Sequence, residues 1–290
     1  MKTLTARLFV LLQYLLPRYL MTRLFYRLAR IRTPWFKNLL IGRFVRLFDV
    51  DIAEAARAVP QEFQSFNDFF TRELRDGARP IEAAADSIVS PADGTLSACG
   101  EIVGRHVFQA KGKQYSLDDL LAIDLDDADA LTGGSFATIY LAPYNYHRVH
   151  SPFAGEISGL RYVPGDLFSV NAATVAHLPR LFARNERLLL RIDTAAGRCF
   201  VVRAGALNVG SITTPWTGEI RPQRSGMARN LQPAADRPLS VATGDLLGWF
   251  NMGSTVIVLM PPGTAAWSDD CVAGRSLRMG EAIGRLQPSA

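Results

Sequence analysis

The feature that most constrains the fold is a long series of short, strand-like segments that begins after Ile81. Runs of β-branched and aromatic residues alternate there with Gly, Pro, Asn and Asp, a pattern typical of strands joined by turns. The clearest runs are residues 136–141, 188–192, 199–202 and 255–260. Helical interruptions are few, and one is predicted to begin at Ser116 with Asp119 as its capping-box partner. No strand–helix–strand alternation, GxGxxG motif or P-loop is present, so a parallel α/β fold is not expected.

Helical periodicity is concentrated before this β-rich part. Two groups of apolar residues recur at helical spacing on either side of Pro17: Leu8, Leu11, Leu12 and Leu15, then Leu20, Leu24, Leu28 and Ile31. Residues 35–48 form a third mixed apolar and basic stretch, and short helices are also predicted over 52–59 and within 66–81. The expected fold class is therefore α+β, with N-terminal amphipathic helices followed by a β-rich barrel- or sandwich-like domain.

Positive charge is concentrated at the N-terminus. Residues 1–50 contain ten Lys or Arg residues and one acidic residue, whereas the remaining residues carry 22 basic and 26 acidic side chains. The high sequence pI, about 9.3, is therefore caused by the basic residues of this one segment. A localised basic surface is indicated, and a nucleic-acid-binding body is not expected.

The apolar runs of the same N-terminal segment are too short to cross a bilayer. Its longest apolar run, residues 8–16, has nine residues including Gln13, whereas a spanning helix needs about 20. No A-x-A cleavage site follows, so a signal peptide is not expected. We expect two or three helices in a membrane interface, with leucines toward the lipid and arginines toward anionic headgroups. The alternative is a helical subdomain packed on the protein's own core.

Cysteine usage indicates a reducing compartment. Cys99, Cys199 and Cys271 are far apart in the sequence and lack CxxC spacing, so they fit neither a disulfide framework nor a zinc site.

Two of the four histidines, His147 and His150, lie three residues apart between Pro143 and Pro152. On a helix this spacing would suit a metal, but the segment is predicted to be a strand, where these side chains point to opposite faces. No metal site is therefore expected. Either the two histidines have different roles, or one is structural and the other lies on the surface.

Two further residues are chemically notable. Asp93 precedes Gly94 in a predicted turn, where an Asx-turn is its ordinary role. Ser254 lies where a loop enters the apolar run 255–260, and Val256 excludes a G-x-S-x-G nucleophile elbow. Together an aspartate, a histidine and a loop serine provide the parts of a base-activated serine.

Several segments together resemble the bacterial phosphatidylserine decarboxylases, in the order in which that family has them. The matching segments are FNDFFTRELRDGARPI (66–81), SPADG (90–94), YLAPYNYHRVHSP (140–152), YVPGDLFSVN (162–171), LFARNERL (181–188), VGSI (209–212) and GSTVIVL (253–259). The resemblance implies conversion of phosphatidylserine to phosphatidylethanolamine and CO2. It also implies self-cleavage between Gly253 and Ser254, giving a β chain (1–253) and an α chain (254–290) that pair as a heterodimer.

The resemblance also implies roles for individual residues. Ser254 would become a covalent pyruvoyl group that forms a Schiff base with the substrate, so neither pyridoxal phosphate nor a metal is expected. Asp93, His150 and Ser254 would form the charge relay for self-cleavage, and His147 would act as the acid or base in decarboxylation. The domain division expected is a membrane-association segment over 1–50 and a catalytic domain over 51–290.

The sequence departs from the family pattern at two positions. Met252 replaces the usual Leu before Gly-Ser, a change of similar volume that should leave cleavage intact. Asn145 replaces the common Asp before Tyr-His, which removes a possible charge beside His147 and puts in doubt how its protonation is tuned.

The expected partners are phosphatidylserine and an anionic membrane surface, without nucleic acid, at the cytoplasmic side of the cell membrane. Only Lys111 and Lys113 lie outside the basic segment among the four lysines, which further disfavours a pyridoxal-phosphate enzyme. Two other functions are open: an interfacial serine hydrolase that uses Ser254, His150 and Asp93 without self-cleavage, and a non-catalytic membrane-bound β-scaffold.

Overall fold

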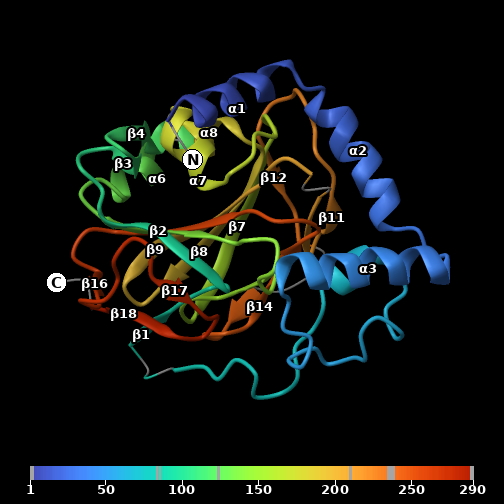
Figure 1. Cartoon of the computed structure of the whole chain (residues 1–290). Coiled ribbons are helices and arrows are strands. Elements are labelled where there is room, and N and C mark those ends of the chain that lie inside the picture. The colour runs from blue at the N-terminus through green and yellow to red at the C-terminus, as the bar shows by residue number, and fades with distance from the viewer. Residues whose placement is uncertain are drawn as a thin grey trace.

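A computed structural model describes residues 3–82, 84, 86–122, 125–208, 211–233 and 239–287 (Figure 1). Val209 and Gly210, the first half of the VGSI segment, lie outside this described part. The helices are α1 (Thr3–Leu15), α2 (Arg18–Ala29), α3 (Pro34–Phe48), α4 (Phe66–Phe70), α5 (Leu117–Leu121), α6 (Leu125–Ala130), α7 (Ala172–His177) and α8 (Leu181–Arg184). The strands are β1 (Ser87–Val89), β2 (Gly94–Glu101), β3 (His106–Ala110), β4 (Lys113–Ser116), β5 (Ser135–Tyr140), β6 (Arg148–His150), β7 (Gly155–Val163), β8 (Arg187–Thr194), β9 (Gly197–Ala204), β10 (Ile212–Thr214), β11 (Gly218–Ile220), β12 (Arg229–Leu231), β13 (Leu239–Val241), β14 (Leu246–Phe250), β15 (Thr255–Met260), β16 (Ala265–Trp267), β17 (Ser276–Leu277) and β18 (Ala282–Leu286).

A nine-stranded antiparallel sheet forms the main body, in the order β12-β7-β8-β9-β15-β5-β2-β17 with β13 also paired to β7. Strand β15 lies inside this sheet between β9 and β5, and all six of its residues are buried. Its first residue, Thr255, pairs with Ala204 on one side and Tyr140 on the other. The apolar run predicted at 255–260 therefore anchors the residue before it, Ser254, in the middle of the sheet.

A second, four-stranded sheet has the order β11-β10-β14-β6 and carries His150 at the end of β6. Strand β14 ends at Phe250, four residues before Ser254, so the connection between β14 and β15 joins the two sheets. A smaller sheet, β1-β18-β16, holds much of the remaining C-terminal part. The predicted α+β class, with helices first and a β-rich body after them, is confirmed.

The local predictions had mixed outcomes. All four strand runs are confirmed as β5, β8, β9 and β15, and helix α5 begins as expected, with the Ser116 hydroxyl accepting the Asp119 amide. The helix predicted over 52–59 is wrong, and the one within 66–81 ends at Phe70. Backbone pairing explains both errors: Ala55 bridges Leu74 in an antiparallel arrangement, and this long-range contact replaces the local helical bonds.

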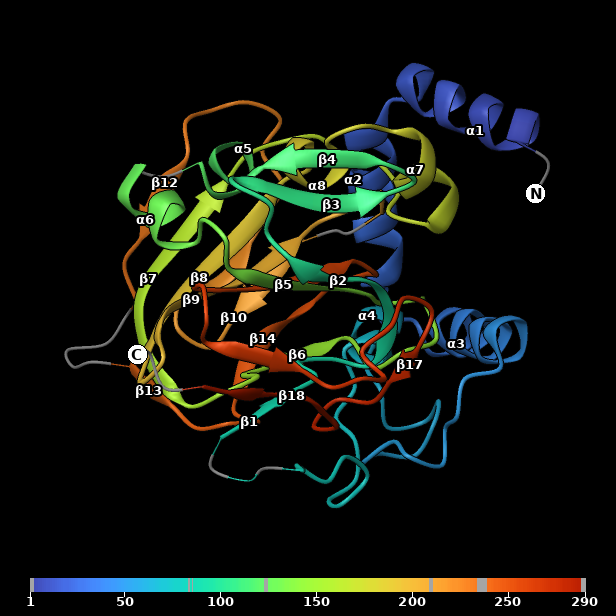
Figure 2. The same cartoon turned by 90° about the vertical axis from the view of Figure 1, so that its left-hand side faces the viewer.

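Helices α1, α2 and α3 lie along the outside of the body, at its top and right-hand edges in Figure 1 and on its right-hand side in Figure 2. The buried Gln13 fixes α1 to the body, since its amide donates to Thr174 Oγ1 and accepts the Ser169 amide. Arg30 at the end of α2 pairs with Glu219 at 2.6 Å. Helix α3 packs against an aromatic cluster that we define as Phe63, Phe66, Phe69 and Phe70.

The leucines of the two predicted helical stripes are about half exposed or more. Their exposed fractions are Leu8 62%, Leu11 61%, Leu12 51%, Leu15 78%, Leu20 55%, Leu24 51% and Leu28 47%. The helices thus pack on the rest of the chain, as the alternative interpretation expected, but through other residues and with the leucines outward. Among the described helices, none combines the length and the apolar character needed to cross a bilayer.

Candidate active site

Ser254 lies at the entrance to β15 with its side chain fully buried. Its carbonyl accepts the Leu141 amide at 2.9 Å, which fixes the backbone on the N-terminal side of the strand. Its Oγ has no hydrogen-bond partner in the described part of the chain. A buried hydroxyl without a partner is unfavourable for stability, and such groups are often associated with function.

His147 is the imidazole adjacent to the Gly253–Ser254 bond. Its Nδ1 donates to the Asn145 carbonyl at 2.8 Å, which leaves a lone pair on Nε2. That Nε2 lies 3.4 Å from the point where a Cβ on Gly253 would stand, and no described group forms a hydrogen bond with it. The ring packs on Phe70 of the aromatic cluster, with 4.0 Å between ring centroids.

The surroundings of His147 keep it neutral. Complete burial lowers its pKa to about 3; the carbonyl of Asn145 acts in the opposite direction, and the charge of Arg72 lowers the pKa further. The Asn145 side chain instead accepts the Ala142 amide at 2.8 Å and closes a turn. Because the backbone of residue 145 holds the ring, replacement of the family's Asp by Asn leaves this hydrogen bond in place.

His150 has both ring nitrogens engaged. Nδ1 donates to the Gly244 carbonyl at 2.7 Å, and Nε2 lies 3.1 Å from the Tyr146 hydroxyl, which donates to it. Burial lowers the pKa of His150, and the charge of Asp93 is among the effects that oppose this shift. Asp93 therefore acts on His150 through its charge, and in the described structure no hydrogen bond joins His150 to Asp93 or Ser254.

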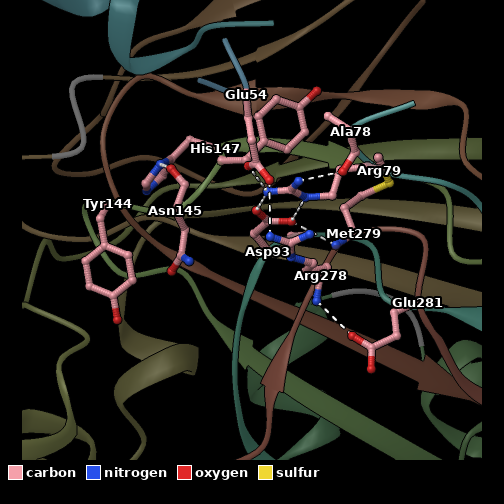
Figure 3. A network of polar contacts seen from close by, with 12 residues as sticks. Glu54, Ala78, Arg79, Asp93, Tyr144, Asn145, His147, Arg278, Met279 and Glu281 are labelled. Atoms are coloured by element: carbon pink, nitrogen blue, oxygen red, sulfur yellow. Dashed lines mark hydrogen bonds and ion pairs between the residues drawn. The ribbon is translucent and has the colours of Figure 1, made fainter. Parts of the chain in front are cut away.

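The Asp93 carboxylate is instead held by Arg79, through bonds of 2.8 Å and 2.6 Å, and by the Met279 amide at 2.8 Å (Figure 3). Arg79 also pairs with Glu54 at 2.7 Å, so one guanidinium connects two carboxylates. The side chains of Arg79 and Asp93 are only 8% and 7% exposed. The structure thus places Ser254 and His147 at the Gly253–Ser254 bond but does not connect the charge relay, which stays a prediction.

Sequence reasoning missed Arg79, Tyr146 and the role of Phe70. Arg79 and Phe70 both lie within the segment 66–81 that carried the resemblance, so its motif match was the available signal. Tyr146 adjoins His147 in the YHRVH segment, but nothing in that spacing indicates that its hydroxyl turns toward His150.

A cavity of about 550 Å³ opens beside this site, between α3 and the body. Gly253 and Met252 form part of its wall, and Arg43 adds a cation from α3. Its apolar lining includes Phe25, Leu40, Phe44, Leu47, Phe48, Phe66, Phe70, Leu141, Pro143, Val170 and Leu207. Within the described ranges, no group of three or more His, Cys, Asp or Glu side chains is placed to hold a metal ion.

Comparison with known proteins decides the family. A family model described as phosphatidylserine decarboxylase matches residues 66–285, and a second model, described as PSD, matches residues 8–49. The chain belongs to the phosphatidylserine decarboxylase family. The resemblance inferred from its motifs is thereby confirmed, as is its expected membership of a family of decarboxylating enzymes. The matches give no support to a serine hydrolase.

Individual phosphatidylserine decarboxylase proenzymes are similar over almost their whole length. The chain is 46% identical to the phosphatidylserine decarboxylase proenzyme of Methylococcus capsulatus, over 98% of both chains. It is 45% identical to that of Saccharophagus degradans, over 98% of this chain and 99% of the relative, and 45% identical to that of Pseudomonas aeruginosa, over 96% of each. Their name describes these relatives as precursors.

Proposed function

We propose that this protein decarboxylates phosphatidylserine to phosphatidylethanolamine and CO2 after cutting itself between Gly253 and Ser254. Two observations carry the proposal: within the described residues the buried Ser254 hydroxyl has no hydrogen-bond partner, and the unpartnered Nε2 of His147 faces Gly253, the residue before Ser254. Gly253 also forms part of the wall of the largely apolar cavity. Self-cleavage would give a β chain, 1–253, and an α chain, 254–290, which stay together because β15 pairs with both β5 and β9.

The self-cleavage step follows from the position of Ser254. Its Oγ attacks the Gly253 carbonyl carbon, the C–N bond breaks, and the nitrogen of Ser254 takes up a proton, which gives an ester. Loss of the Ser254 α-proton then breaks the Cβ–Oγ bond and releases the Gly253 carboxylate. The remaining dehydroalanine isomerises, and one water hydrolyses it to a pyruvoyl group and ammonia. A buried hydroxyl without a competing hydrogen bond suits the first of these steps.

A base must take the proton of the Ser254 hydroxyl. We assign this role to His150, with Asp93 favouring the charged imidazole, which requires His150 Nε2 to release the Tyr146 hydroxyl. His147 has an unpartnered Nε2 next to Gly253, so it is the competing candidate for this base. Neutral His147 is assigned to the later reaction.

In the decarboxylation, the pyruvoyl group supplies a carbonyl that withdraws electrons from the substrate as CO2 leaves. The residues of the chain move the proton. Nε2 of His147 takes the proton that the substrate ammonium must lose and returns it to the α-carbon after CO2 has left. No pyridoxal phosphate or metal is part of this proposal.

The cavity suits a lipid headgroup presented at a membrane. Its apolar lining accommodates the upper acyl chains, and Arg43 can pair with the phosphate. The exposed leucines of α1 and α2, with Arg23 and Arg27 exposed beside them, form the surface that would bind an anionic bilayer. We therefore propose peripheral binding at the cytoplasmic side of the cell membrane, with residues 1–50 as the membrane segment and 51–290 as the catalytic domain.

The functional proposal is tested with vesicles containing phosphatidylserine. The wild-type chain should form phosphatidylethanolamine, and Ser254→Ala should be uncut and inactive. His150→Ala should block cleavage, whereas His147→Ala should be cut and then turn over at least about 100-fold more slowly. The reverse pattern would exchange the two histidine roles, and activity in Ser254→Ala would refute the proposal.

Membrane binding is tested by vesicle flotation in a salt series. The double substitution Leu24→Glu and Leu28→Glu should abolish flotation with anionic vesicles without disturbing the core, since both leucines are about half exposed. Val103→Glu, at a body residue 69% exposed, is the matched control and should still float. Binding that survives the double substitution, or that ignores ionic strength, would contradict the proposal.

A further inference from the structure

Two of the three thiols lie in contact although 172 positions separate them. Cys99 is on β2 and Cys271 is in the loop between β16 and β17, and their Sγ atoms are 2.9 Å apart. Both are free thiols. The sequence prediction that the cysteines suit no disulfide rested on their spacing, and this contact gives a reason to revise it.

The backbone on both sides of the contact is fixed. The Gly274 amide donates to the Leu96 carbonyl at 2.8 Å, and the Leu96 amide donates to the Arg275 carbonyl at 2.9 Å. Strand β17 then continues the pairing with β2. The two sulfurs are thus held together by main-chain bonds, and closing them to the length of a disulfide, about 2.05 Å, needs a movement of less than about 1 Å.

The chemistry of the pair favours Cys271 as the attacking sulfur. The hydrogen bond with Cys99 lowers the pKa of Cys271, and the charge of Arg275 acts in the same direction. The thiolate is the reactive form of cysteine. Cys271 is 8% exposed and Cys99 is partly exposed, so a small oxidant can reach them.

We propose that Cys99 and Cys271 form an oxidation site whose disulfide joins the two chains made by self-cleavage. The interchain character rests on the proposed function, because Cys99 lies in the β chain and Cys271 in the α chain. With a peroxide as oxidant, one thiolate is oxidised to a sulfenic acid, and the second displaces its oxygen as water. Two thiols and one hydrogen peroxide thus give one disulfide and two waters.

The linkage has a structural consequence for the mature enzyme. The α chain carries the group derived from Ser254 and is otherwise held by non-covalent contacts, chiefly the pairing of β15. In a reducing compartment the pair stays as thiols, and oxidation adds a covalent bond between the chains.

The test is a non-reducing gel of the processed protein after hydrogen peroxide and alkylation of the remaining thiols. The α chain should run together with the β chain and separate from it after addition of dithiothreitol. Cys99→Ser and Cys271→Ser should each release the α chain without reductant. Cys199→Ser is the matched control, because this third cysteine is buried on β9, and it should retain the link.

A second measurement separates this proposal from the proposed cleavage. Peptide mapping of peroxide-treated Ser254→Ala should find one cross-linked peptide pair containing Cys99 and Cys271, whether or not the chain is ever cut. The same mapping of the wild-type chain decides the matter if a cysteine variant fails to fold. Alkylation of both thiols after peroxide treatment, or loss of the link in Cys199→Ser, would overturn the proposal.

Discussion

Replacing Arg79 by Met should strongly destabilise the precursor. Arg79 and Asp93 are 8% and 7% exposed and share two hydrogen bonds. Among the described residues, the substitution therefore leaves the buried Asp93 carboxylate with the Met279 amide as its one partner. Removing one member of a buried ion pair costs about 3–5 kcal/mol. Asp93→Asn should cost less, about 1–3 kcal/mol, because Arg79 keeps Glu54 and an amide oxygen can still accept the Met279 amide.

The assay is urea unfolding at neutral pH in a Ser254→Ala background, where the chain cannot be cut. The free energy of unfolding of the double variant should fall by less than the sum of the decreases in the two single variants, by at least about 0.5 kcal/mol, since both substitutions disrupt the same ion pair. Arg105→Met is the matched control: its ion pairs with Asp118 and Asp129 are far more exposed, so the loss should be about 0–1 kcal/mol. Equal losses for Arg79→Met and Arg105→Met, or strict additivity, would show that burial of the Arg79–Asp93 pair does not set its contribution to stability.

Two further predictions use the same background. The pKa of His147 is lowered from 6.5 to about 3 in the folded chain, so its contribution to stability is complete above pH 6.5 and is lost as the pH falls toward 3. Between neutral pH and about pH 5, the free energy of unfolding of His147→Phe should therefore fall by about 2 kcal/mol less than that of the parent. The same pH dependence of the free energy of unfolding in both proteins, measured with urea, would contradict this. Gly94→Ala should cost about 1–3 kcal/mol, because its Cβ would lie 2.4 Å from the Tyr140 carbonyl oxygen. At Gly42 on α3, an added Cβ would meet no described atom within 4 Å beyond the neighbouring backbone of its own helix, so Gly42→Ala should raise the thermal midpoint or leave it unchanged. An equal loss of stability at both glycines would argue against the steric explanation.

The strands could be predicted from the sequence because a buried run such as 255–260 carries its own signal of β-branched residues between turns. Local patterns could not predict that residues 52–59 pair with the segment after α4, since the bridge between Ala55 and Leu74 forms only in the folded chain. The amphipathic helices followed from the leucine spacing, but whether those leucines face the body or the solvent depends on tertiary packing.

In the candidate site, too, the residue types could be predicted from the sequence, whereas their contacts could not. Motifs identified Ser254 and the two histidines by residue type, and the structure places His147 and Ser254 at one bond. The motifs could not indicate that Arg79 forms the ion pair with Asp93. Any cation nearby in space can pair with a buried carboxylate, and which one does so depends on the fold. Sequence separation likewise concealed the contact between Cys99 and Cys271.

The claim that a hydroxyl of this chain cuts its own backbone is tested most directly by the intact mass of a catalytically active, reduced preparation. Two species are expected: residues 1–253 with a free carboxylate, and residues 254–290 lighter by one ammonia than a chain beginning with serine. A single uncut polypeptide of 290 residues, active on phosphatidylserine and with an ordinary serine at position 254, would contradict it.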